Sequence, residues 1–258
     1  MKNAWTLARK DSAAYFHSWT GVILLTLFSF VAGMFFLIPF STYAKISIQA
    51  SAEAYAGLKG FSPSRFIFSS FFLNFGNVLV CIIPFLSMRA FAEERSLQTL
   101  ELLFTYPLSD VEIVCGKFLG MIRFFFFLIA PTLVYLLLLR WAGAELEWGV
   151  IIAGYSGLFL LGTSYLSLGL FISSISANQV VSAMVTFTLL LAFWILDWVS
   201  GLMDGSSAHF FSALSPFGHY RDFTLGIVDR SDIAYFIFFN LYFLFLALRS
   251  IEVRNWKG

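Results

Sequence analysis

The charged side chains that could do chemistry gather in one stretch, residues 91–117, which we call the coupling loop. If the stretch is helical, Glu94, Gln98 and Glu101 share one face, because they are spaced four and three residues apart. Leucines fall on the opposite face. A helix with one polar and one apolar face suits a membrane surface or a partner protein. We therefore expect it to bind a partner and transmit force, with no catalytic role.

The rest of the chain lacks the residue spacings of a catalytic or metal site. His17, His209 and His219 are far apart, and Cys81 and Cys115 form no CxxC pair. No G-x-S-x-G motif occurs, and the single Gly-Lys pair lacks the first glycine of a phosphate-binding loop. We expect a non-enzymatic chain without a cofactor or metal of its own.

Three polar residues lie within apolar runs and are candidates for a translocation pathway: Asn74, Asn77 and Asp197. An ionisable residue inside a span is a functional hypothesis, but Asp197 lies close to the end of its run and also fits a solvated helix end. The two asparagines share a helical face, where they can line a cavity or hydrogen-bond across helices. Both alternatives stay open at each position.

The composition excludes a soluble domain. Of 258 residues, 59% are hydrophobic and only 12% are charged, with a mean hydropathy of +0.83. The 33 phenylalanines exceed what a soluble core of this size needs. A net charge of +1, without a basic stripe, gives no sign of nucleic-acid binding.

Apolar runs of membrane-spanning length predict an all-α integral membrane protein with six spans. The expected spans are about 21–40, 66–88, 118–139, 149–172, 180–199 and 233–248. The uncharged run 148–196 would be roughly 73 Å long as one helix, more than twice a bilayer core of about 30 Å. It must therefore turn back, and Ser173–Gln179 is the polar cluster that allows this.

Local signals bound the remaining elements. Residues 1–20 combine aromatic and cationic residues, as in an interfacial helix or a positively charged flank of the first span. Pro107 should end the helix of the coupling loop, and Ser109 with Glu112 should form the capping box of the next helix. Pro131 should kink that helix, while Lys117 should extend toward the lipid headgroups.

The coupling loop resembles the cytoplasmic loop of ABC-2 type permeases. The resemblance rests on four strings: Ala92-Glu93-Glu94-Arg95, Thr99-Leu100-Glu101-Leu102-Leu103, Thr105-Tyr106-Pro107-Leu108-Ser109 and Glu112-Ile113-Val114-Cys115-Gly116-Lys117. It implies docking on a separate ATPase subunit, which would hold the ATP and magnesium. The ATPase-coupling residues that it implies are Glu93, Glu94, Arg95, Gln98, Thr99, Glu101 and Pro107. The family usually has glycine where Gln98 stands, and helix propensity predicts that this change leaves the helix intact.

Residues 201–232, which we call the outer hairpin, are similar to the hairpin before the last span of the gliding-motility and nitrous-oxide-reductase-maturation permeases. The segment is too apolar for a free loop and too interrupted by Pro216, Gly218 and Gly226 to span a membrane. We expect a re-entrant hairpin in which Phe217 and Phe223 form an outer gate.

Lysine and arginine counts place both termini and the coupling loop in the cytoplasm, ten against six. The resemblance implies a permease subunit, and we expect an ATP-driven exporter in a bacterial inner membrane. Expected partners are an ATPase subunit, a second or related permease copy, membrane lipid and an auxiliary outer-side protein. The competing hypothesis is an ATP-independent transporter or a membrane scaffold. The sequence names no substrate.

Overall fold

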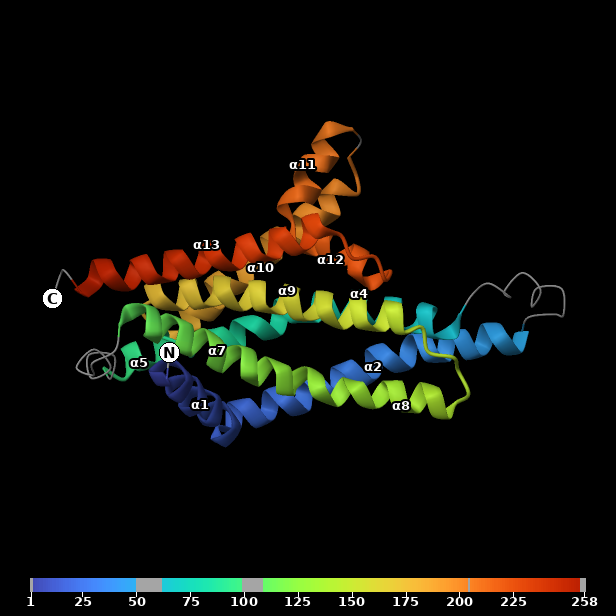
Figure 1. The fold of residues 1–258 in the computed structure, drawn as a ribbon, viewed down its shortest axis with the longest axis horizontal. Coiled ribbons are helices and arrows are strands. Elements are labelled where there is room, and N and C mark those ends of the chain that lie inside the picture. The colour runs from blue at the N-terminus through green and yellow to red at the C-terminus, as the bar shows by residue number, and fades with distance from the viewer. Residues whose placement is uncertain (1, 50–61, 99–108, 204, 256–258) are drawn as a thin grey trace.

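The computed structural model describes residues 2–49, 62–98, 109–203 and 205–255, and every regular element within these ranges is helical. Six helical stretches are long and apolar enough to cross a membrane. The predicted all-α architecture with six spans is therefore confirmed. The long helices form an elongated bundle, and both termini lie at the same end as α5 (Figure 1).

The helices in chain order are α1 Lys2–His17, α2 Trp19–Gln49, α4 Pro63–Ser87, α5 Ala92–Ser96, α7 Asp110–Ile129, the 3-10 turn η1 Ala130–Leu133, α8 Val134–Trp141, α9 Trp148–Ile175, α10 Gln179–Ser200, α11 Ser206–Leu214, α12 Pro216–Thr224 and α13 Arg230–Asn255. The prediction of an interfacial helix near the N-terminus corresponds to α1, which packs mainly on α7.

The first long helix continues beyond its expected end. The first span was expected at about residues 21–40, but α2 runs to Gln49. The hydroxyls of Ser41 and Thr42 both donate to the carbonyl of Ile38, each at 2.9 Å. Because these polar side chains return their hydrogen bonds to the helix backbone, polarity alone does not end the helix.

Two local predictions about the third span are confirmed. Ser109 caps α7, with the Ser109 hydroxyl accepting from the backbone of Glu112 and the Glu112 side chain accepting from the backbone of Ser109. Pro131 lies in η1, the 3-10 turn that separates α7 from α8. A proline cannot donate to the helical ladder, which accounts for the interruption.

Helix α9 is central to the bundle, and more of it is buried than of any other span in the described ranges. Two of its glycines allow phenylalanine rings to pack directly against the helix backbone. A Cβ added at Gly154 would lie 2.1 Å from the ring of Phe72, and one at Gly162 would lie 2.1 Å from the ring of Phe125. These glycines therefore make part of α9 a packing surface for its neighbours. Phenylalanines of α4 complete the core: Phe68, Phe71, Phe72 and Phe75 are fully buried.

The outer hairpin contains two short helices. Helix α12 packs into the bundle against α9 and α4, whereas α11 projects from its side (Figure 1). Ser215 begins α12, where its hydroxyl accepts from the backbone of Gly218 and donates to the carbonyl of Phe193 at 3.0 Å. The hairpin is therefore attached to α10 at the point where it turns.

Candidate functional site: the coupling helix and its contacts

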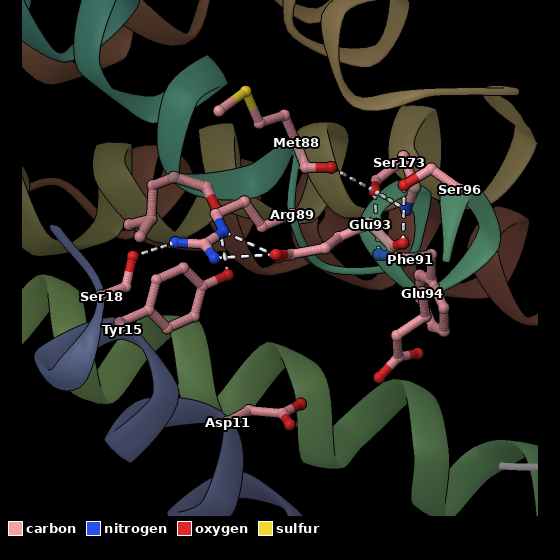
Figure 2. Close-up of polar contacts among 12 residues, drawn as sticks. Asp11, Tyr15, Ser18, Met88, Arg89, Phe91, Glu93, Glu94, Ser96 and Ser173 are labelled. Atoms are coloured by element: carbon pink, nitrogen blue, oxygen red, sulfur yellow. Dashed lines mark hydrogen bonds and ion pairs between the residues drawn. The ribbon is translucent and has the colours of Figure 1, made fainter. Parts of the chain in front are cut away.

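A side chain of α9 caps the first turn of the short helix α5. The backbone N–H groups of Phe91 and Ala92 both donate to the Ser173 hydroxyl oxygen at 3.0 Å (Figure 2). That hydroxyl donates in turn to the carbonyl of Met88, with an oxygen–oxygen distance of 3.3 Å. The first N–H groups of a helix have no partner within the helix, so Ser173 supplies a cap from another element.

Arg95 attaches the other end of α5 to the same helix. Its guanidinium donates to the carbonyl of Ser174 at 2.5 Å and to the carbonyl of Ser176, both in the C-terminal turn of α9. Carbonyls there lack helical partners and carry the negative end of the helix dipole, so a cation is favourable. Both ends of α5 are thus bonded to the last turn of α9.

Lys117 of α7 connects α5 to α1. Its ammonium group lies 2.7 Å from a carboxylate oxygen of Glu94 and 3.6 Å from one of Asp11, and 5.1 Å above the ring of Phe91. Its side chain is only 3% exposed. The prediction that Lys117 extends toward the headgroups is wrong, because two carboxylates and an aromatic face compensate its burial.

A second ion pair fixes the junction of α4 and α5. Arg89 donates to both carboxylate oxygens of Glu93, at 2.7 and 2.8 Å, and to the Ser18 hydroxyl at 2.5 Å (Figure 2). The Tyr15 hydroxyl donates to the carbonyl of Leu86 at 3.0 Å. Burial raises the pKa of Tyr15, so this donor keeps its proton at neutral pH. Residues of α1, α5 and α7, and of the turn between α4 and α5, surround a cavity of about 220 Å³ beside these contacts.

The division of the coupling loop into a partner face and an opposite face stays a prediction, but the described residues of α5 also contact other elements of this chain. Glu94 points inward to Lys117, whereas Leu97, expected to face inward, is 65% exposed. Glu93 and Arg95 also bind elements of this chain. The predictions for Thr99, Glu101 and Pro107 concern residues outside the described ranges, so their part in ATPase coupling stays a prediction.

Gln98 explains why a glycine is usual at its position. Helix α5 ends at Ser96, and Gln98 follows with a φ of 56°, in the left-handed region. Its N–H donates to the carbonyl of Arg95 at 3.1 Å. A helix commonly ends on such a residue, and glycine adopts this conformation without steric cost. The prediction of an uninterrupted helix through Gln98 is wrong, because its helix propensity is not what matters there.

The pathway candidates gather toward the outer hairpin. Asp197 of α10 is buried and accepts from Arg221 of α12 at 2.7 Å, so the solvated-helix-end alternative is wrong. Asn77 accepts from the indole of Trp194 at 2.8 Å and therefore joins α4 to α10. Asn74 donates to the carbonyl of Ser70 in its own helix. Asn77 and Asp197 both line a cavity of about 410 Å³ between α4, α10 and α12; its lining does not include Asn74.

The expected gate residues are packing residues within one copy of the chain. Phe217 is 4% and Phe223 1% exposed. A Cβ added at Gly157 of α9 would lie 2.4 Å from that of Phe223, and one at Gly76 of α4 would lie 3.1 Å from the Phe217 ring. Both rings thus fill spaces opened by glycines, and a role in gating stays a prediction.

Sequence reasoning missed the cap from Ser173, the ion pairs of Lys117 and a contact between His219 and Asp232, 2.7 Å apart. The charge of Lys117, which has only apolar residues and glycine as near neighbours in α7, was the signal that could have revealed one of them. In the described ranges, no three His, Cys, Asp or Glu side chains lie together as a metal site would require.

Comparison with known protein families identifies a family for nearly the whole chain. A family model described as "ABC-2 family transporter protein" matches residues 5–250. No curated protein matches the chain. The resemblance identified from the coupling loop is confirmed at the level of the family. The chain belongs to the ABC-2 family of transporter proteins and is a multi-pass membrane subunit that the family pairs with an ABC ATPase.

Proposed function

We propose that this chain is the permease subunit of an ATP-driven exporter, in which a separate ATPase binds at α5 and moves the bundle. Two permease copies, or two related subunits, would enclose the path between them. The termini and α5 would face the cytoplasm of a bacterium, and the outer hairpin would face the opposite side. We also propose that the chain is related to the gliding-motility and nitrous-oxide-reductase-maturation permeases.

The observation that carries the proposal is the attachment of α5 to the end of α9. A docking helix transmits motion only if it is bonded to the elements that must move. Ser173 caps its start, and Arg95 holds its end on the carbonyls of Ser174 and Ser176. Glu94 adds a link to α7 through Lys117. A displacement of α5 would therefore displace α9 and α7 with it.

Helix α9 also contacts the outer hairpin, so a displacement of α9 would reach the hairpin. Phe223 of α12 packs on Gly157, near the other end of α9. The cavity that contains Asn77 and Asp197 lies between α4, α10 and α12. A shift of α9 would change the position of α12 and with it the shape of this cavity, where we place a part of the translocation path.

The test uses the chain co-purified with its ATPase in lipid nanodiscs. Arg95→Ala removes both bonds to the end of α9, and charged hydrogen bonds of this kind contribute about 1.5–3 kcal/mol. Arg249→Ala is the matched control, because Arg249 is 61% exposed and its described partners, Glu252 and the ring of Phe245, lie in the same helix.

We expect the Arg95→Ala complex to assemble and hydrolyse ATP. Its nucleotide-dependent change in hydrogen exchange at residues 216–224 should be lost, while Arg249→Ala should keep that change. Failure of any ATPase to co-purify would favour the scaffold or ATP-independent hypothesis. An undiminished change in Arg95→Ala would contradict transmission through α9.

A further inference from the structure

His219 lies where three elements of the outer hairpin region meet. It belongs to α12; its Nδ1 lies 2.7 Å from a carboxylate oxygen of Asp232 in the first turn of α13, and its Nε2 lies 3.1 Å from the carbonyl oxygen of Ala213 in α11. The ring of Tyr235 stacks on the imidazole with centroids 4.0 Å apart, and the Tyr235 hydroxyl donates to the carbonyl of Leu214.

The partners of the imidazole determine its proton count. A carbonyl oxygen only accepts, so Nε2 must donate to Ala213. An ionised carboxylate also only accepts, so Nδ1 must donate to Asp232. A neutral imidazole carries one N–H and can satisfy only one of these contacts. If the carboxyl carries the second proton instead, the pair still holds two protons, so the count does not depend on where that proton lies.

The surroundings make this second proton important. Asp232 is 5% exposed, and its other carboxylate oxygen is buried with no hydrogen-bond partner in the described part of the chain. A buried carboxylate without a charged partner is strongly disfavoured. The aromatic face of Tyr235 favours an imidazolium beside it.

The other ionisable groups on the packed elements do not replace this proton. Arg221 pairs with Asp197 of α10, and Asp229 receives a backbone hydrogen bond from Ser231. The remaining groups on α11, α12 and the start of α13 are exposed: His209, Asp222 and Arg230. Within the described contacts, His219 is thus the side chain placed to compensate Asp232.

We propose that the His219–Asp232 pair is a proton-binding site that closes the outer hairpin onto α13. Uptake of one proton joins α11, α12 and α13. Loss of that proton removes one of the two ring hydrogen bonds and leaves the Asp232 carboxylate without a charged partner. Because the closed form holds the additional proton, acid closes the hairpin and alkali loosens it.

The test is hydrogen exchange of the full chain in nanodiscs at pH 5 to 8, corrected for the intrinsic effect of pH on exchange. Residues 211–224 should exchange about 10- to 100-fold more slowly at pH 5 than at pH 8, as expected for one charged hydrogen bond. His209→Gln, on exposed α11, is the matched control and should keep this dependence.

Two variants should remove the pH dependence of hydrogen exchange, one with fast exchange and the other with slow exchange. His219→Gln cannot take up the ring proton, so its hairpin should exchange fast at every pH. In Asp232→Asn, the amide donates to a neutral Nδ1 while Nε2–H still binds Ala213, so its hairpin should exchange slowly at every pH. A purely structural contact would give no such opposite pair.

Nitrogen NMR of the imidazoles, assigned with His219→Gln, reads the proton count directly. Protonation of both His219 ring nitrogens at pH 5, or of one nitrogen with a protonated Asp232 carboxyl, supports the proposal. A wild-type hairpin whose exchange does not change with pH would overturn it, as would a titrating His219→Gln or Asp232→Asn variant.

Discussion

The close contact between α9 and α12 can be tested with one methyl group. A Cβ added at Gly157 would lie 2.4 Å from the Cβ and 2.6 Å from the Cγ of Phe223. Carbon atoms pack at about 3.5–4.0 Å, so Phe223 would have to retreat by more than about 1 Å. The nearest atom is the Cβ, which no rotamer change can move. Gly157→Ala should therefore push α12 as a whole away from α9.

Gly149 on the same helix provides the control, because a Cβ there meets nothing within 4 Å. Alanine in place of glycine stabilises a helix by up to about 1 kcal/mol, and this gain applies to both variants. Overpacking costs about 1–3 kcal/mol and applies only to Gly157→Ala. The difference between the two variants thus isolates the clash and corresponds to a roughly 5- to 150-fold change in an opening equilibrium.

The measurement is hydrogen exchange of residues 216–224 in nanodiscs, together with thermal unfolding of both variants. We expect faster exchange in Gly157→Ala, and unchanged or slower exchange in Gly149→Ala. Equal exchange in both variants would refute the packing of α12 against α9.

Three further predictions use other contacts. Gln98→Gly should relieve the left-handed strain, worth about 1 kcal/mol, and slow amide exchange in α5; faster exchange would show that the Gln98 side chain stabilises this end. Phe217→Ser and Phe223→Ser should each lower stability by about 3–5 kcal/mol, seen as reduced folded yield and thermal stability; a stable protein with raised basal ATP hydrolysis would favour the gate instead. In a cysteine-free background, Trp141→Cys should react with an impermeant thiol reagent in intact cells and Gln98→Cys should not; the reverse pattern would invert the proposed orientation.

The sequence predicted those features that depend on neighbouring residues. The uncharged run 148–196 required a turn, and α9 and α10 are separated at Ser176–Asn178 within the predicted cluster. The capping box of Ser109 and the interruption at Pro131 follow from the chemistry of one or two side chains. Such features can be predicted because the groups that interact are close in the chain.

The contacts of α5 could not be predicted in this way, because the interacting residues are distant in the chain. Lys117 meets Asp11 and Glu94, and Ser173 caps a helix that begins at Ala92. An amphipathic pattern shows that a face is polar, but not whether its charges meet a partner or the same chain. That is why the ion pair of Glu94 with Lys117 was not foreseen. At position 98, the glycine that is usual in the family indicated a left-handed backbone conformation. This would have been a better basis for prediction than the helix propensity of Gln98.

The contacts that α9 makes with α5 and those that it makes with α12 differ in how easily they can be broken. Ser173 and Gly157 are roughly 24 Å apart along one helix at 1.5 Å per residue, so a displacement at one reaches the other with little bending. Hydrogen bonds and ion pairs hold α5 at the first, and these contacts can exchange with those of a docking partner. Glycine-to-phenylalanine packing holds α12 at the second and leaves no freedom to slide. Helix α12 should therefore move with α9, and the separation should occur where polar groups join the outer hairpin to α13, at His219 and Asp232.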